Sequence, residues 1–144
     1  MILLDTNILL YAHIESYEVH TRVHDWLDER FNSGAPVGFP WQAIYGFLRI
    51  STNPRAFKRP KTMQSALKHV GFWLDHEASW IPGPTNRHFA IAQTLLRTPG
   101  VYGEIVSDVH LAALAIEHGL VLCSLDTDFA RFPGLRWENP LRAS

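Results

Sequence analysis

Three aspartates stand where short apolar runs meet a turn or the start of a helix. Asp5 follows the run at residues 2–4, Asp126 closely follows the run at 120–123, and Asp108 begins a long apolar segment. Each acid alone could cap a helix or a turn, where a cap contributes about 1 kcal/mol. Carboxylates gathered at one point are also the ligands that a hard divalent cation prefers. The repetition of the pattern favours a metal site over three independent caps.

The apolar pattern predicts short strands that alternate with amphipathic helices. Strands are expected at residues 1–4, 37–39, 80–81, 121–124 and 135–137, and helices at 19–31, 41–52, 62–74, 85–96 and 107–118. We expect Thr62 and Thr85 to act as N-caps and Gly119 to end the last helix. The side chains expected to face the core are Trp41, Ile44, Tyr45 and Leu48, then Met63, Ala66, Leu67, Val70, Trp73 and Leu74, then Phe89, Ala92, Leu95 and Leu96.

Strands interleaved with helices predict an α/β fold, because right-handed crossovers place helices on both faces of a parallel sheet. With 144 residues, 47% of them hydrophobic, the chain has the size of one domain with a sizeable core, spanning residues 1–144. We expect a three-layer α/β/α sandwich around a mainly parallel sheet of four to five short strands. Ligands collect outside the carboxyl ends of such strands, so Asp5, Asp108 and Asp126 are expected to meet at one edge.

Composition narrows the classes of partner and compartment. A formal net charge of -1 at pH 7 excludes a uniformly basic nucleic-acid coat, so a polyanion must be held by a local basic patch or through metal. The single cysteine, Cys123, lies in an apolar run and is expected to be a buried free thiol, which suits a reducing cytoplasm. No leader or membrane-spanning stretch is evident, and we expect a soluble cytoplasmic protein with no membrane partner.

Four blocks of sequence, in order, resemble the landmarks of PIN-domain proteins, in particular the VapC-type ribonuclease toxins of toxin–antitoxin pairs. The blocks are Met-Ile-Leu-Leu-Asp-Thr-Asn at residues 1–7, Phe-Leu-Arg-Ile-Ser-Thr-Asn-Pro-Arg at 47–55, Ser-Asp-Val-His-Leu-Ala-Ala-Leu-Ala at 107–115, and Leu-Asp-Thr-Asp-Phe-Ala at 125–130. They extend over nearly the whole chain.

The resemblance implies a PIN-like fold and a metal-dependent endoribonuclease that hydrolyses RNA phosphodiester bonds with metal-activated water and so inhibits translation and growth. It implies Mg²⁺, with Mn²⁺ as a substitute, and as partners an RNA substrate, a cognate VapB-like antitoxin and a second copy in a homodimer. By the matching positions the catalytic and metal-binding residues are Asp5, Asp108 and Asp126, with Asp128 as a further metal ligand and Asn7 and Ser124 as supporting polar residues.

One position departs from the family pattern. PIN proteins usually carry a glutamate where this chain has Gly46, which leaves open whether one metal or two are bound. Glu104 is close enough in sequence to supply a substitute carboxylate, and its ordinary interpretation is an exposed loop acid. The departure also keeps a second function in view, a catalytically weak or inactive PIN domain that binds RNA or a protein partner.

A basic segment begins near the end of the predicted helix at 41–52 and continues beyond it. Arg49, Arg55, Lys58 and Arg59 are clustered around Phe57. Basic groups beside an aromatic ring can follow a phosphate backbone and stack a base, so these four residues are predicted to bind RNA. The alternative is a solvated loop anchored by one buried aromatic side chain.

Two other chemistries fit less well. A haloacid-dehalogenase-type phosphatase needs a second aspartate two residues after the first strand-end acid, and that position is Asn7. A zinc site on His20 and His24, which have helical spacing, lacks a glutamate or cysteine companion at a useful offset, so these two histidines are expected to lie on the surface.

Overall fold

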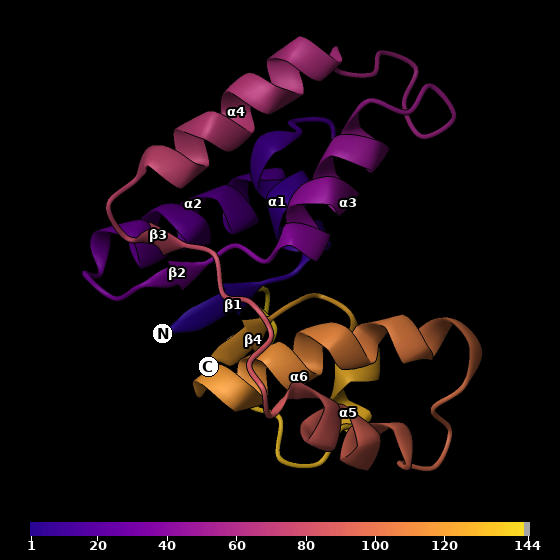
Figure 1. The fold of residues 1–144 in the computed structure, drawn as a ribbon. Coiled ribbons are helices and arrows are strands. Elements are labelled where there is room, and N and C mark those ends of the chain that lie inside the picture. Colours follow the sequence, from indigo (N-terminus) through magenta and orange to yellow (C-terminus); the bar gives the residue numbers. More distant parts are fainter. Residues whose placement is uncertain (143–144) are drawn as a thin grey trace.

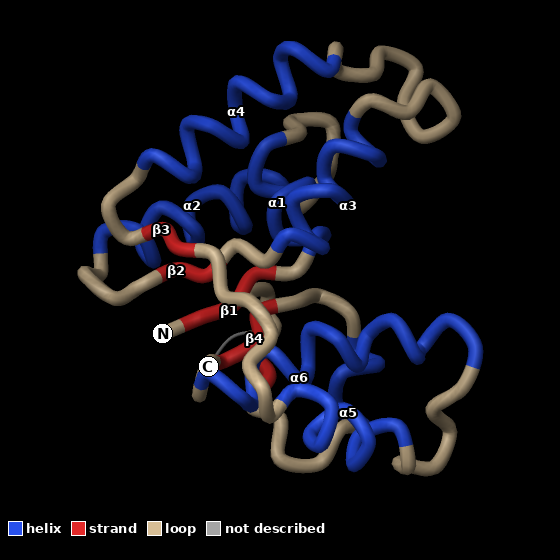
Figure 2. The backbone as a smooth tube through the Cα atoms, viewed as in Figure 1, coloured by secondary structure: helices blue, strands red, loops and turns tan. Residues whose placement is uncertain are grey.

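Five short strands form the centre of the structure, a computed structural model that describes residues 1–142. The strands are β1 (Ile2–Leu4), β2 (Val37–Gly38), β3 (Ser79–Trp80), β4 (Val121–Cys123) and β5 (Trp137–Glu138). Their order in the sheet is β3-β2-β1-β4-β5, and every neighbouring pair is parallel. The predicted central parallel sheet is therefore confirmed, and Figure 2 shows its red strands enclosed by blue helices.

Helices cover both faces of this sheet. They are α1 (Thr6–His13), α2 (His20–Asn32), α3 (Trp41–Ser51), α4 (Met63–Asp75), α5 (His88–Leu96) and α6 (Asp108–His118), with the 3-10 helices η1 (Gly103–Ser107) and η2 (Thr127–Arg131). Figure 1 shows α1 to α4 above the sheet and α5 and α6 below it. The buried side chains divide in the same way into two clusters, one for each face. The three-layer α/β/α sandwich predicted from the sequence is confirmed.

The central strand β1 serves both cores because successive side chains point to opposite faces. Ile2 and Leu4 pack with the helices of the first face, and Leu3 packs with α5 and α6. In the register of β1 and β4, Leu4 is paired with Cys123. The residues that follow these two strands therefore emerge side by side at one edge of the sheet.

The first helix was absent from the sequence prediction. Asp5 has extended backbone angles, and its side chain accepts a hydrogen bond from the Thr6 amide, which makes it the N-cap of α1. Residues Ile8 to Leu10 are all buried, so α1 lacks a polar side along its first turns and shows little of the helical period. A short apolar run of this kind cannot be distinguished from a buried strand by periodicity alone.

Of the three residues predicted to cap helices, two are confirmed. Thr62 caps α4 by accepting a hydrogen bond from the Ser65 amide at 3.1 Å, and Gly119 ends α6 in the left-handed region at φ 67°. The prediction for Thr85 is wrong, because α5 begins at His88. The Thr85 hydroxyl donates to the buried carboxylate of Glu117 at 2.7 Å and accepts from the Arg87 amide at 3.2 Å, in the turn before the helix.

Several side chains predicted to face the core are exposed. On α3 the buried residues are Ala43, Ile44 and Phe47, whereas Trp41 is 51% exposed and Tyr45 65% exposed. The helix therefore packs through a face rotated from the one predicted, since apolar residues stand on both sides of it. Met63 and Leu67 of α4 and Phe89 and Leu96 of α5 are likewise exposed.

The remaining expectations about the chain body concern its cysteine and its helices. Cys123 lies fully buried in β4 as a free thiol, as predicted. Burial raises the pKa of this thiol far above its usual range, so the thiol is protonated and inert. Within residues 1–142, no helix combines the length and the apolar character needed to cross a bilayer.

Candidate metal centre

Three carboxylates meet at the carboxyl edge of the sheet. Asp108 is the first residue of α6, Asp126 immediately precedes η2, and Asp128 lies within η2. One side-chain oxygen from each lies within 4.8 Å of the other two. The structure thus brings together three of the four acids that the sequence placed around a metal.

Asp5 lies beside this group but is not one of its members. Its Oδ1 accepts a hydrogen bond from the Thr6 amide at 2.7 Å, and its Oδ2 accepts one from the Ser124 hydroxyl at 2.7 Å. Burial raises the pKa of Asp5, the hydrogen bonds from Ser124 and Thr6 oppose that rise, and the charge of Asp126 adds to it. Asp5 is therefore close enough to repel Asp126 while its own oxygens are held by the protein.

Asn7 and Ser124 join the ends of β1 and β4. The Asn7 amide nitrogen donates to the Ser124 Oγ at 3.1 Å, and its carbonyl oxygen accepts from the Leu125 amide at 3.3 Å. The Ser124 Oγ also accepts from the amide of Asp126 at 3.0 Å. These bonds fix the two strand ends relative to each other, so the positions of Asp5 and Asp126 are set by a buried polar network rather than by flexible loops.

The other two acids are held by local contacts. Oδ1 of Asp126 accepts from the Asp128 amide at 2.9 Å, a cap on the first turn of η2. Asp128 pairs with Arg131 at 3.1 Å, and the same guanidinium donates to the carbonyl of Gly100 at 3.3 Å. One cation therefore stands against several carboxylates.

The electrostatics of the edge show an excess of negative charge. Burial and then the charges of Asp126, Asp5 and Asp128 raise the pKa of Asp108 from 3.8 to about 6, and Arg131 only partly opposes them. An all-oxygen donor set with uncompensated charge fits a hard divalent cation such as Mg²⁺ or Mn²⁺. It does not fit zinc, which structural sites hold through nitrogen and sulfur.

Two further positions singled out in the sequence, Glu104 and Gly46, add no carboxylate to the group. Glu104 is exposed in η1, in agreement with its ordinary interpretation as a surface acid. At Gly46 on α3, an added Cβ atom would lie 2.5 Å from the Thr6 Oγ1. The Thr6 side chain occupies the space beside Gly46, and α3 contains no aspartate or glutamate, so it contributes no carboxylate to this edge.

The predicted RNA-binding residues occupy a different region. Arg49 lies on α3, and Arg55, Lys58 and Arg59 lie in the loop that joins α3 to α4, all of them exposed. Figure 1 shows that this loop lies at the end of α3 remote from the sheet. In the described part of the chain, none of the four basic side chains forms an ion pair.

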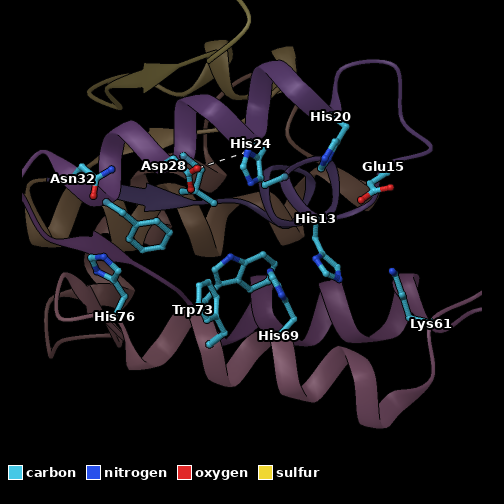
Figure 3. A pocket seen from close by; sticks show the side chains of 14 residues that line it. His13, Glu15, His20, His24, Asp28, Asn32, Lys61, His69, Trp73 and His76 are labelled. Atoms are coloured by element: carbon cyan, nitrogen blue, oxygen red, sulfur yellow. Dashed lines mark ion pairs between the residues drawn. The ribbon is translucent and has the colours of Figure 1, made fainter.

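A cavity lined by histidines lies away from the acidic edge and was not predicted from the sequence. It has a volume of about 350 Å³ and lies between α1, α2 and α4, as Figure 3 shows. His13 and His69 stack there with ring centroids 3.7 Å apart, and burial lowers the pKa of His69 to about 4. His24 is exposed as expected, whereas His20 is half-buried. The histidines around the cavity are His13, His20, His24, His69 and His76.

Comparison with known proteins agrees with the fold. A model of the PIN domain family matches residues 2–135. Ribonuclease VapC37 of Mycobacterium tuberculosis is 38% identical over 140 residues, which cover 97% of each chain. Ribonuclease VapC33 of the same organism is 39% identical over 142 residues, which cover 99% of each chain.

Two solved structures share the fold at lower identity. One is VapBC2 from Rickettsia felis, bound to a DNA fragment from its promoter, at a TM-score of 0.72 and 19% identity, with 96% of this chain and 98% of that chain covered. The other is VapBC-1 from nontypeable Haemophilus influenzae, at a TM-score of 0.68 and 17% identity, with 99% and 100% covered. The chain belongs to the PIN domain family and groups with its VapC members.

Proposed function

We propose that this chain is a metal-dependent endoribonuclease and the toxin of a VapBC-type toxin–antitoxin pair. The observation that carries the proposal is the meeting of Asp108, Asp126 and Asp128 within 4.8 Å, with Asp5 beside them. The relatives that are more than a third identical over nearly their whole length are named ribonucleases. Geometry and family point to the same chemistry.

In this proposal the chain's own residues hold and orient the reacting groups. Asp108, Asp126 and Asp128 hold Mg²⁺ or Mn²⁺, and Asp5 adds negative charge from the end of β1. The cation supplies an activated water and stabilises negative charge on the phosphodiester as its bond breaks. Asn7 and Ser124 keep the two strand ends in register, so that the acids would hold the cation without rearrangement.

The RNA backbone is proposed to cross the exposed basic residues Arg49, Arg55, Lys58 and Arg59. Each phosphate contact made by such a residue steepens the salt dependence of binding. Replacing Arg55, Lys58 and Arg59 with alanine should weaken RNA binding and flatten its dependence on salt. Unchanged affinity and slope would show that this segment is only a solvated loop.

Partner proteins follow from the family. The solved Rickettsia and Haemophilus relatives are VapBC assemblies, and we propose that this chain pairs with a VapB-like antitoxin and forms a homodimer. We place the pair in the cytoplasm, where a buried thiol such as Cys123 stays reduced. Co-expression with the gene that adjoins its own, followed by purification through one tagged chain, tests the pairing.

One observation favours a second function. Because position 46 is glycine and α3 contains no aspartate or glutamate, the centre has fewer carboxylates than the family pattern predicts. A centre of this kind could bind RNA or a protein partner with little cleavage. Chemistry and binding must therefore be measured separately.

The experiment compares RNA cleavage with Mg²⁺, with Mn²⁺ and with a chelator, using a mixed RNA pool. We expect cuts only with metal, leaving 5′-phosphate and 3′-hydroxyl ends because water is the nucleophile. Asp108→Asn and Asp126→Asn should abolish cutting, and the matched control Glu104→Gln, an exposed acid outside the group, should not. Cleavage that survives the chelator, or either aspartate substitution, contradicts the proposal. Binding without cleavage would instead support the second function.

A further inference from the structure

Helix α3 exposes an aromatic and basic stripe. Trp41, Tyr45 and Arg49 are spaced four residues apart and therefore lie on one face of the helix. Trp41 is 51% exposed and Tyr45 65% exposed, with their ring centroids 5.8 Å apart and the planes inclined at 33°. Large aromatic rings grouped on a surface beside a cation mark a place where something binds.

The stripe borders a hollow of about 690 Å³. Tyr45 and Arg49 line it from α3, Met63 lines it from α4, and Gly46 with Thr6 lines the side nearest the sheet. Gly46 presents no side chain to the hollow, and the side chain of Thr6 lies against it.

The hollow opens beside the acidic edge. Thr6, which lines it, donates its backbone N–H to the carboxylate of Asp5 at 2.7 Å. One wall of the hollow is therefore formed by the residue that follows Asp5. From there α3 leads outward to the basic loop that carries Arg55 and Lys58 (Figure 1).

The chemistry of the hollow selects its occupant. Its lining contains an aromatic ring, a guanidinium and the amide of Gln42, and no carboxylate. A nucleobase offers an aromatic face to Tyr45 and polar edges to Gln42, and its phosphate offers a negative charge to Arg49. A paired base would have its faces covered by neighbours, so the occupant must be unpaired.

We propose that Trp41, Tyr45 and Arg49 form a nucleobase platform, which seats an unpaired base of the RNA beside the acidic edge. The proposal rests on RNA being the substrate of that edge. Tyr45 stacks on the base, Trp41 extends the stacking surface, and Arg49 contacts the adjoining phosphate.

The test measures binding without cleavage. Protein in chelator is titrated with a single-stranded oligouridylate of about ten nucleotides, and with an abasic ribose-phosphate strand of the same length and charge. Tyr45→Ala should weaken oligouridylate binding by about five- to 150-fold, which corresponds to about 1–3 kcal/mol per stacked base. Its affinity for the abasic strand should stay at the wild-type value, because that strand has no base to stack.

Matched variants separate stacking from folding. Tyr45→Phe keeps the ring and should bind oligouridylate like wild type. Phe89→Ala removes a ring that is 70% exposed on α5 and should also leave binding unchanged. Oligouridylate should quench tryptophan fluorescence in the wild type and quench it less in Trp41→Phe.

Three results would overturn the platform. The first is unchanged oligouridylate binding by Tyr45→Ala, and the second is an equal loss on the abasic strand. The third is that Tyr45→Ala sediments as a monomer where the wild type is a dimer and keeps its RNA affinity. The stripe would then be a contact between two copies of the chain. Failure of the proposed function is distinguishable: metal-dependent cleavage would be missing in the wild type, while base-dependent binding by Tyr45 would persist.

Discussion

Replacing Asp108 with asparagine removes one negative charge from an edge where the carboxylates of Asp5, Asp126 and Asp128 repel it. Burial and the charges of Asp126, Asp5 and Asp128 raise the pKa of Asp108 from 3.8 to about 6. Such a rise corresponds to about 3 kcal/mol at neutral pH. Solvent screening of this half-buried carboxyl, and its favourable place at the N-terminus of α6, reduce the net to about 1 kcal/mol. We therefore expect metal-free Asp108→Asn to be more stable than wild type by about that amount.

The pH dependence follows from the direction of the shift. Between pH 3.8 and about 6 the folded chain keeps a proton on Asp108 that the unfolded chain has lost. The contribution of this group to the free energy of unfolding is therefore complete below pH 3.8 and is lost as the pH rises through about 6. The stability advantage of Asp108→Asn should be present at neutral pH and absent below the ordinary pKa of an aspartate.

Urea denaturation in chelator, at neutral and at acidic pH, measures both quantities. Glu104→Gln is the matched control, because this acid is exposed and should change stability at neither pH. Adding Mg²⁺ or Mn²⁺ should stabilise wild type and Glu104→Gln, and should stabilise Asp108→Asn less. If metal-free Asp108→Asn is no more stable than wild type at neutral pH, or keeps its advantage in acid, the electrostatic argument is wrong.

Three further outcomes are expected. Gly46→Ala should destabilise the protein by about 1–3 kcal/mol, because the new Cβ meets the Thr6 Oγ1 at 2.5 Å, and Thr6→Ala in the same chain should recover most of the loss in thermal denaturation. Glu117→Gln should cost about 1–3 kcal/mol, because it removes the charge and replaces Oε2, the partner of His88 Nδ1, with an amide NH₂, although Oε1 can still accept from the amide and hydroxyl of Thr85. Burial tends to raise the pKa of Glu117 but these bonds lower it overall, so its stabilising effect should fade below pH 4.5, and urea titrations of the variant should lack that acid limb. The pKa of His69, lowered from 6.5 to about 4, makes wild-type stability rise with pH across that interval. His69→Phe should reduce this rise in urea denaturation, and the lowered pKa values of His13 and His110 should maintain the rest.

The strand-end acids were predictable because topology alone brings them together. Parallel strands end at one edge, so any acid that closes β1 or follows β4 must lie there. The apolar pattern separately predicted a helix at 107–118 with Asp108 in its first turn, and α6 begins at Asp108. The topology could not show that the two carboxylate oxygens of Asp5 accept hydrogen bonds from Thr6 and Ser124, because those bonds depend on side-chain geometry.

The orientation of helices was less predictable. On α3, apolar residues occupy several faces, and the sequence gives no sign that Phe47 and Ala43 turn inward while Trp41 and Tyr45 face water. The stacked histidines in the cavity between α1, α2 and α4 were hidden for another reason. His13 and His69 meet only because α4 packs beside α1, a contact that no local spacing encodes.

The pairing of β1 with β4 has a consequence during synthesis on the ribosome. Leu4 pairs with Cys123, and the hydroxyl that donates to Asp5 comes from Ser124. The side chain of Asp5 therefore reaches its final position only after the last quarter of the sequence has been synthesised. Contacts of such long range form slowly and late. A nascent chain that stops short of β4 therefore carries Asp5 without Ser124 and without the carboxylates of Asp126 and Asp128.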